Sequence, residues 1–161
     1  MPASITEIEW IKKDIRKEYR LFQGDKDIGY LKWRRIFRSY AIGELKGETY
    51  TFLLKGFFNK TLIIQAADTR KKLGIIRKVR YKKNIILLYN GRKYSWKYMN
   101  FLRTKSGWFS LESNEPFIAY TNPFFYFRDH GKIQYEFLTE EENLLILAGL
   151  FLRLIRINVY L

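Results

Sequence analysis

The sequence predicts a mainly β domain of antiparallel strands that ends in one very hydrophobic helix. Apolar and polar residues alternate through the first three quarters of the chain, turn residues interrupt this alternation at short intervals, and the last quarter contains a segment that is apolar on every side. The 161 residues, of which 47% are hydrophobic, suffice for one substantial core, and no linker-like stretch divides them. We therefore expect a single domain over residues 1–161.

Short runs with apolar residues at alternating positions define about a dozen expected strands. Lys46-Gly47 provides a turn within a hairpin over 40–54, and the run 61–66 is apolar on both faces, as in a strand that is covered on both sides. Many short strands of this kind are typical of a β sandwich or a β barrel. The other expected strands lie at about 5–10, 19–21, 28–33, 73–81, 84–89, 92–99, 107–111, 117–120 and 133–138.

One hairpin has a particularly clear turn signal. Asn90-Gly91 is the dipeptide favoured in two-residue type I′ turns, and such a turn fixes the register of the two strands that it joins. The predicted register pairs Leu87 with Tyr94 and Leu88 with Lys93. Leu88 is therefore expected on the same face of the sheet as Lys93.

The end of the chain predicts one helix over about 140–157. Thr139 followed by three glutamates forms a capping box, with negative charge where the helix dipole favours it. Residues 144–152 are apolar around the whole circumference, so the helix must be buried. Because the apolar run is shorter than the ~20 residues of a bilayer span and Arg153 and Arg156 interrupt it, we expect burial inside the protein.

A succession of β hairpins closed by an all-round hydrophobic helix, here 144–155, resembles the tubby C-terminal-like superfamily. That superfamily includes tubby domains, LURP-one-related proteins and phospholipid scramblases. The resemblance covers nearly the whole chain and implies a closed barrel of twelve strands around a central helix. It also implies phosphoinositide binding through basic side chains, as in tubby domains. Scramblases carry an acidic calcium-binding segment, but residues 140–142 are explained by the helix start, so calcium-dependent scrambling is not expected.

Several functional classes are disfavoured by what the sequence lacks. The absence of cysteine excludes disulfides, thiolate zinc sites and a cysteine nucleophile. His130 is the single histidine, Asp129-His130-Gly131 is typical of a turn, and no glycine-rich phosphate loop or HExxH pattern occurs. We expect a protein that is not an enzyme and uses no metal or cofactor. The N-terminus lacks the pattern of a secretory signal, so a cytoplasmic location, or one peripheral to a membrane, is expected.

The charge of the chain points to a polyanionic partner. The net charge is +14, and residues 70–105 contain thirteen Lys or Arg and no acidic residue. Strand alternation should place five of these cations on one outer surface, opposite the face of the neighbouring aromatic side chains. The candidate anion-binding residues are Lys78, Arg80, Lys82, Lys93 and Lys97.

Several functions are compatible with such a surface. Because Ile86 and Leu88 are expected beside Lys93, the surface would be amphipathic, which favours an anionic membrane or a lipid headgroup of the phosphoinositide type. The alternatives are a solvated surface whose lysines prevent aggregation, and nucleic-acid binding with aromatic rings stacked on bases. Tyr94 and Trp96 are expected on the core side, which weakens the nucleic-acid hypothesis. A membrane-inserted, lipid-moving protein that uses the terminal helix is a further hypothesis.

Overall fold

The computed structural model describes residues 4–13, 17–34, 40–56, 60–77, 83–122, 129–136 and 141–159. Within these ranges, twelve antiparallel strands form a closed barrel around one helix, α1 (Glu142–Val159). The strands are β1 (Thr6–Lys13), β2 (Glu18–Gln23), β3 (Lys26–Trp33), β4 (Tyr40–Leu45), β5 (Glu48–Lys55), β6 (Thr61–Ala66), β7 (Lys72–Ile76), β8 (Lys83–Leu88), β9 (Lys93–Tyr98), β10 (Lys105–Ser110), β11 (Ile118–Thr121) and β12 (His130–Tyr135). The predicted fold class is confirmed.

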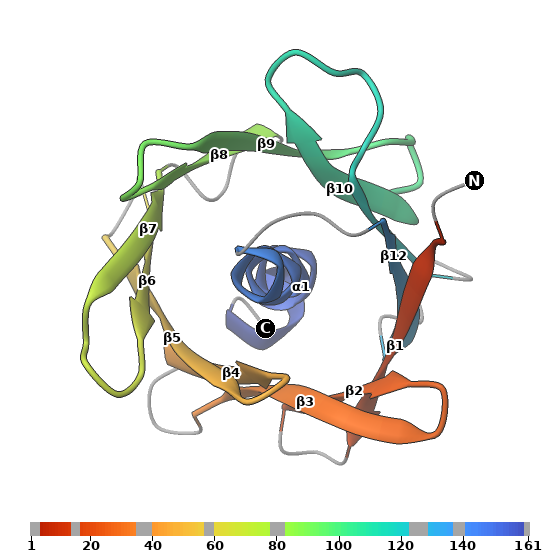
Figure 1. Cartoon of the computed structure of the whole chain (residues 1–161), viewed down its shortest axis with the longest axis horizontal. Helices are drawn as coiled ribbons and strands as arrows, with labels where there is room; N and C mark the ends of the chain where they lie inside the picture. The colour runs from red at the N-terminus through yellow and green to blue at the C-terminus, as the bar shows by residue number, and fades with distance from the viewer. Residues whose placement is uncertain are drawn as a thin grey trace.

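The barrel has an up-and-down topology: each strand pairs with its neighbours in the sequence, and β1 pairs with β12 to close the ring. Figure 1 shows the strands as a ring, in chain order, with α1 at its centre. At the closure, Trp10 pairs with Gly131, and a Cβ on Gly131 would lie 2.2 Å from the Trp10 ring. The glycine therefore provides the space that this indole occupies.

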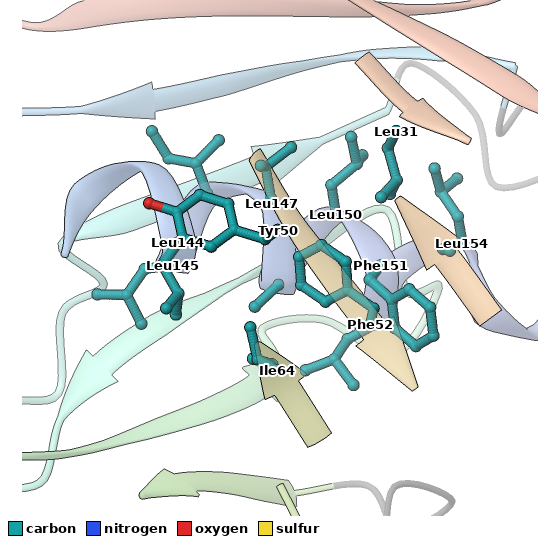
Figure 2. Close-up of a cluster of buried hydrophobic side chains, with 14 of the residues drawn as sticks. Leu31, Tyr50, Phe52, Ile64, Leu144, Leu145, Leu147, Leu150, Phe151 and Leu154 are labelled. Atoms are coloured by element: carbon teal, nitrogen blue, oxygen red, sulfur yellow. The ribbon is translucent and has the colours of Figure 1, made fainter. Parts of the chain in front are cut away.

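The helix fills the barrel as the all-round apolar sequence predicts. Between Leu144 and Ile155 its described hydrophobic side chains are at most 4% exposed. Figure 2 shows Leu147, Leu150 and Phe151 of α1 among side chains from the inner faces of β3, β5 and β6. Burial inside the protein, which the shortness of the apolar run favoured, is what the structure shows.

Phe151 lies between two aromatic rings of the barrel wall. Its ring stacks on Trp33 at 5.1 Å and on Phe52 at 5.5 Å between centroids, with interplanar angles of 19° and 15°. Stacked rings of this kind stabilise the folded state by more than the burial of their surface alone.

On another side of α1, polar groups of the wall bind the helix backbone. Trp108 Nε1 donates to the Leu145 carbonyl at 2.8 Å, and the Tyr120 hydroxyl donates to the carbonyls of Leu145 and Ile146 at 3.1 and 2.8 Å. Burial raises the pKa of the Tyr120 hydroxyl well above its usual value, so the hydroxyl keeps its proton. Gly149 allows this approach, because a Cβ there would lie 2.2 Å from the Tyr120 oxygen.

The one charged side chain of α1 that the structure shows deep in the barrel is Arg153, at 3% exposure. Its Nε donates to Asn122 Oδ1 and its Nη1 donates to Ser106 Oγ, both at 2.8 Å, and its guanidinium lies 5.8 Å from the centre of the Tyr98 ring. The arginine that was expected to interrupt a hydrophobic run is thus held by polar groups of the wall. Among the residues that the structure describes, no helix has both the length and the apolar character needed to cross a bilayer.

The helix begins at Glu142, within two residues of the expected start, and Thr139 of the predicted capping box lies outside the described residues. Two other local expectations are wrong. His130 and Gly131 are the first residues of β12 and do not form the predicted turn. In β6, only the inner positions are buried, while Ile63 and its outer neighbours are half-buried, because the outer face of a barrel has no second layer over it.

Candidate functional site

The structure places two of the five predicted site residues, and both are on the outer face of β9. Lys93 is exposed and Lys97 is partly exposed, while Trp96 of the same strand is buried in the core. Lys78, Arg80 and Lys82 lie outside the described residues. Unbroken alternation in the strand expected at 73–81 would put Ile76 on the outer face with Lys78 and Arg80, and Ile75 on the core face. In the structure Ile75 faces outward and Ile76 faces the core. The alternation assumed for these three cations therefore does not begin as expected.

The register of the β8–β9 hairpin is one residue away from the predicted one. Leu87, not Leu88, pairs with Lys93. The connection contains three residues, because the Leu88 amide donates to the Arg92 carbonyl at 2.9 Å and the Gly91 amide donates to the Leu88 carbonyl at 2.9 Å. Gly91 has a φ of +89°, while Asn90 lacks the positive φ that a type I′ turn requires.

A shift of one residue exchanges the two faces of a strand. Ile86 and Leu88, expected beside Lys93, are buried in the core at 0% and 3% exposure. The outer face of β8 instead carries Ile85 and Leu87, which are 45% and 39% exposed. Lys93 and Lys97 therefore lie beside apolar side chains as expected, but Ile85 and Leu87 take the places that were predicted for Ile86 and Leu88.

This apolar surface continues across the neighbouring strands. Four aliphatic side chains are direct register partners on the outer faces of β5 to β8, and the row ends at a lysine of β9. The row consists of Leu53, Ile63, Ile75, Leu87 and Lys93. Leu53, Ile63 and Ile75 are half-buried and Leu87 is exposed, so the outer side of the barrel carries an apolar row in addition to the core that fills its interior.

Lys97 is held against an aromatic ring beside this row. Its ammonium lies 4.3 Å from the centre of the Phe109 ring, which is almost fully buried on the outer side of β10. Ser95 lies between Ile85 and Phe109 in the register. The lysine thus has a defined position, and its charge is at the border of the apolar surface. We call Ile85, Leu87, Lys93 and Lys97 the β8–β9 surface.

Acidic residues do not neutralise this surface in the described parts of the chain. Of the cations in the segment 70–105, Arg92 is the one that forms an ion pair there, with Glu141 at 3.0 Å. A second pair joins Lys46 to Glu142 at 3.5 Å. The glutamates at the start of α1 therefore bind cations of the two hairpin turns at that end of the barrel, and they leave Lys93 and Lys97 free for an external anion.

The aromatic side chains of β9 do not form a stacking platform. Trp96 is buried between Trp108 and Tyr120, at 5.4 and 5.0 Å between centroids. Tyr94 packs on Phe117 at 5.1 Å. The core-side placement predicted for Tyr94 and Trp96 is confirmed, and bases could not stack on these rings without opening the barrel.

The single histidine of the sequence lies at the surface of the barrel. His130 is exposed, and the neighbouring Asp129 lies 3.8 Å from Lys12. Both line a recess of about 630 Å³ between β1 and β12, beside Trp10 and Asn122. Within the described ranges, no three His, Cys, Asp or Glu side chains gather as a metal site would need.

Phe101 and Leu102 are two exposed apolar residues of one turn, and neither was among the site residues predicted from the sequence. They lie between β9 and β10, and Phe101 is 98% exposed. Their presence in a connection is unusual in itself, because turns ordinarily contain Gly, Asn, Asp, Ser or Pro. Two large apolar residues in a connection of six residues therefore indicate something other than turn formation.

No protein-family model, curated protein or solved structure matches this chain. The resemblance to the tubby C-terminal-like superfamily therefore remains a hypothesis based on the order of the elements. The function has to be argued from the surface itself.

Proposed function

We propose that this barrel is a non-catalytic module that binds anionic membrane lipid headgroups through the β8–β9 surface. The observation that supports the proposal best is the position of Lys93 and Lys97 at the border of the exposed side chains of Ile85 and Leu87. Lysines attract the headgroups, and the aliphatic side chains are suited to the boundary between headgroups and acyl chains.

The charges support the same partner. Lys93 and Lys97 lie on the same face of β9 with no acidic partner among the described residues, and an anionic ligand supplies the counter-charge that the protein does not. Each lysine near an anionic leaflet contributes about 1 kcal/mol of attraction, which salt screens within a Debye length of about 10 Å at 0.1 M. Binding of this kind should be sensitive to salt and should need anionic lipid. A cytoplasmic protein that binds membranes peripherally would meet such lipid.

Two of the earlier alternatives have less support. Nucleic-acid binding would use exposed rings along a basic groove, whereas the rings of β9 face the core or pack on neighbouring aromatic side chains. A lipid-moving role for α1 would require the helix to leave a barrel in which its apolar residues are buried. A surface that is merely solvated would bind no vesicle, and the experiment below distinguishes that case.

The test is co-sedimentation with liposomes at two salt concentrations. Neutral phosphatidylcholine vesicles are compared with vesicles that also contain phosphatidylserine or a phosphoinositide. We expect binding to the anionic vesicles only, weaker at high salt. In the variant Lys93→Glu/Lys97→Glu, the loss of two attractions of about 1 kcal/mol each should weaken binding by about 30-fold or more.

The barrel offers a matched control on its opposite side. Lys26 and Lys32 are exposed on β3, which lies six strands away from β9 in either direction around the ring (Figure 1). Lys26→Glu/Lys32→Glu lowers the formal charge from +14 to +10, as the test variant does, because two lysines become glutamates in each. Equal loss in both variants would show a general charge effect. No binding to any vesicle would contradict the proposal.

A further inference from the structure

The turn between β9 and β10 is closed by hydrogen bonds and presents apolar side chains. The Arg103 amide donates to the Asn100 carbonyl at 3.2 Å, which makes Phe101 and Leu102 the two central residues of a β-turn. Asn100 Oδ1 accepts from the Thr104 amide at 3.0 Å, and Asn100 Nδ2 donates to Thr104 Oγ1 at 2.6 Å. These hydrogen bonds define the turn backbone that carries the two apolar side chains.

These side chains contact little of the protein itself. Phe101 is 98% exposed and Leu102 is 59% exposed, and Met99 beside them is also exposed. Full exposure of a phenylalanine forgoes most of the free energy that its burial would give. An apolar turn of this kind has a use if the side chains are buried in something outside the barrel.

Cations surround the turn. Arg103 lies 5.4 Å from the centre of the Tyr98 ring, and its backbone has a φ of +56°, a conformation that side-chain-bearing residues rarely adopt. Lys105 is exposed at the start of β10, and Lys97 lies near the end of β9. None of these three cations has an acidic partner among the described residues. An apolar tip with a cationic rim is complementary to the headgroups and the acyl boundary of an anionic bilayer.

The two ends of the barrel differ strongly in composition. The end where α1 finishes has six strand connections, at 14–17, 34–39, 56–60, 77–82, 99–104 and 122–129, and these sequences contain twelve Lys or Arg, two Asp and nine aromatic residues. The connections at the end where α1 begins contain four Lys or Arg, seven acidic residues and three aromatic residues. Of the first set, the structure describes 99–104 completely. Among the described residues of these connections, Arg34, Arg77 and Arg103 place positive charge at the end that carries Phe101, so a flat anionic surface would attract the barrel by that end.

We infer that the barrel docks on anionic bilayers by this end, with Phe101 and Leu102 inserted at the level between the headgroups and the acyl chains. The inference rests on the proposed function and adds an orientation and a membrane anchor to it. Insertion of Phe101 and Leu102 adds a short-range apolar contribution to the binding free energy, while the cations around the turn provide the long-range electrostatic attraction. Of the two placed lysines, Lys97 lies nearer this end than Lys93, since β9 runs from Lys93 toward the turn.

The first test uses the natural absence of cysteine in the chain. Leu102→Cys and Tyr89→Cys each provide one labelling site for an environment-sensitive fluorophore. The two side chains are matched, because both are 59% exposed, and they lie at opposite ends of the barrel. On vesicles with phosphatidylserine, the label at 102 should shift to shorter wavelength and become protected from iodide, while the label at 89 should not change.

The outcomes separate this inference from the proposed function, because sedimentation is measured on the same samples. If the labelled proteins sediment with anionic vesicles but the label at 102 stays accessible to iodide, the insertion is wrong and headgroup binding stands. Equal protection at both positions contradicts the orientation. If no vesicle sediments the protein, the proposed function fails together with the inference. A shift with single-stranded oligonucleotide and none with vesicles would assign the turn to nucleic acid instead.

A second test measures the contribution of the apolar tip. Phe101→Ser/Leu102→Ser should weaken partition onto anionic vesicles at least about tenfold and leave its salt dependence in place. The control is Tyr89→Ser/Leu111→Ser, which removes two exposed apolar side chains at the other end and should weaken binding much less than Phe101→Ser/Leu102→Ser. Unchanged urea midpoints verify folding. Lys97→Glu should weaken binding more than Lys93→Glu, and the reverse order would contradict the docking direction.

Discussion

Replacement of Phe151 by alanine would remove the ring that joins the helix to the barrel wall. The side chain is fully buried and stacks on Trp33 and Phe52. A buried Phe→Ala substitution costs about 3 to 5 kcal/mol, which combines lost burial with the cavity left behind. Small domains have about 5 to 15 kcal/mol of stability in total. At about 2 to 4 °C per kcal/mol for a chain of this length, Tm should fall by roughly 6 to 20 °C.

Urea denaturation followed by tryptophan fluorescence would measure this loss, because all four tryptophans are buried and report the opening of the barrel. Phe101→Ala is the matched control, since it is the same substitution at a position that is 98% exposed. Surface substitutions usually change stability by less than about 0.5 kcal/mol. A loss below about 1 kcal/mol for Phe151→Ala, or equal losses for the two variants, would refute the packing of α1 inside the barrel.

Three further predictions concern the polar contacts of α1. Gly149→Ala should destabilise the protein by about 1 to 3 kcal/mol in thermal unfolding, although alanine favours helices, because its Cβ would overlap the Tyr120 oxygen; a gain in Tm would contradict this. Tyr120→Phe should lower the free energy of unfolding in urea by about 0.5 to 1.5 kcal/mol through loss of its hydrogen bonds to the helix backbone, and no change would exclude that role. Arg153→Met should cost about 1 to 3 kcal/mol, because Asn122 and Ser106 lose a buried donor; increased stability in chemical denaturation would contradict the account.

The fold could be predicted because its signals are local. Alternation places residues such as Trp10 and Phe52 on one face of a strand, and only a closed or covered sheet buries so many of them. The segment around Phe151 is apolar on every side, which requires an environment that surrounds the helix completely. The approximate number of strands and the buried helix follow from these patterns, whereas the closed barrel around that helix was implied by the resemblance to the tubby C-terminal-like superfamily. The structure confirms this architecture.

The face that each residue of β8 presents could not be predicted, for a physical reason. The run Ile85 to Leu88 is apolar throughout, so either register buries two aliphatic residues and exposes two. Only the turn could therefore determine the register of β8 against β9. Asn90-Gly91 is compatible both with a two-residue type I′ turn and with the three-residue connection that is present. The lysines of β9 were placed correctly because they alternate with aromatic residues, whereas the apolar partners of the β8–β9 surface were not.

The exposed turn at Phe101 was missed because an apolar pair between two strands is equally compatible with strand ends that are buried. Its composition is unusual for a turn but does not tell whether the two side chains are buried or exposed, and the closed geometry shows that the connection points away from the core. The difference in charge and aromatic content between the two ends of the barrel was missed for a similar reason. It can be seen only when the strand directions show at which end each connection lies.

The most direct test of the proposed function compares the two charge-reversal variants on the same vesicles. Lys93→Glu/Lys97→Glu and Lys26→Glu/Lys32→Glu have equal net charge, so a difference between them reports where on the barrel the anionic lipid binds. We predict that co-sedimentation with phosphatidylserine vesicles falls by about 30-fold or more in the first variant and much less in the second. Equal binding by the two variants, whether strong or weak, would contradict a lipid-binding role for the β8–β9 surface.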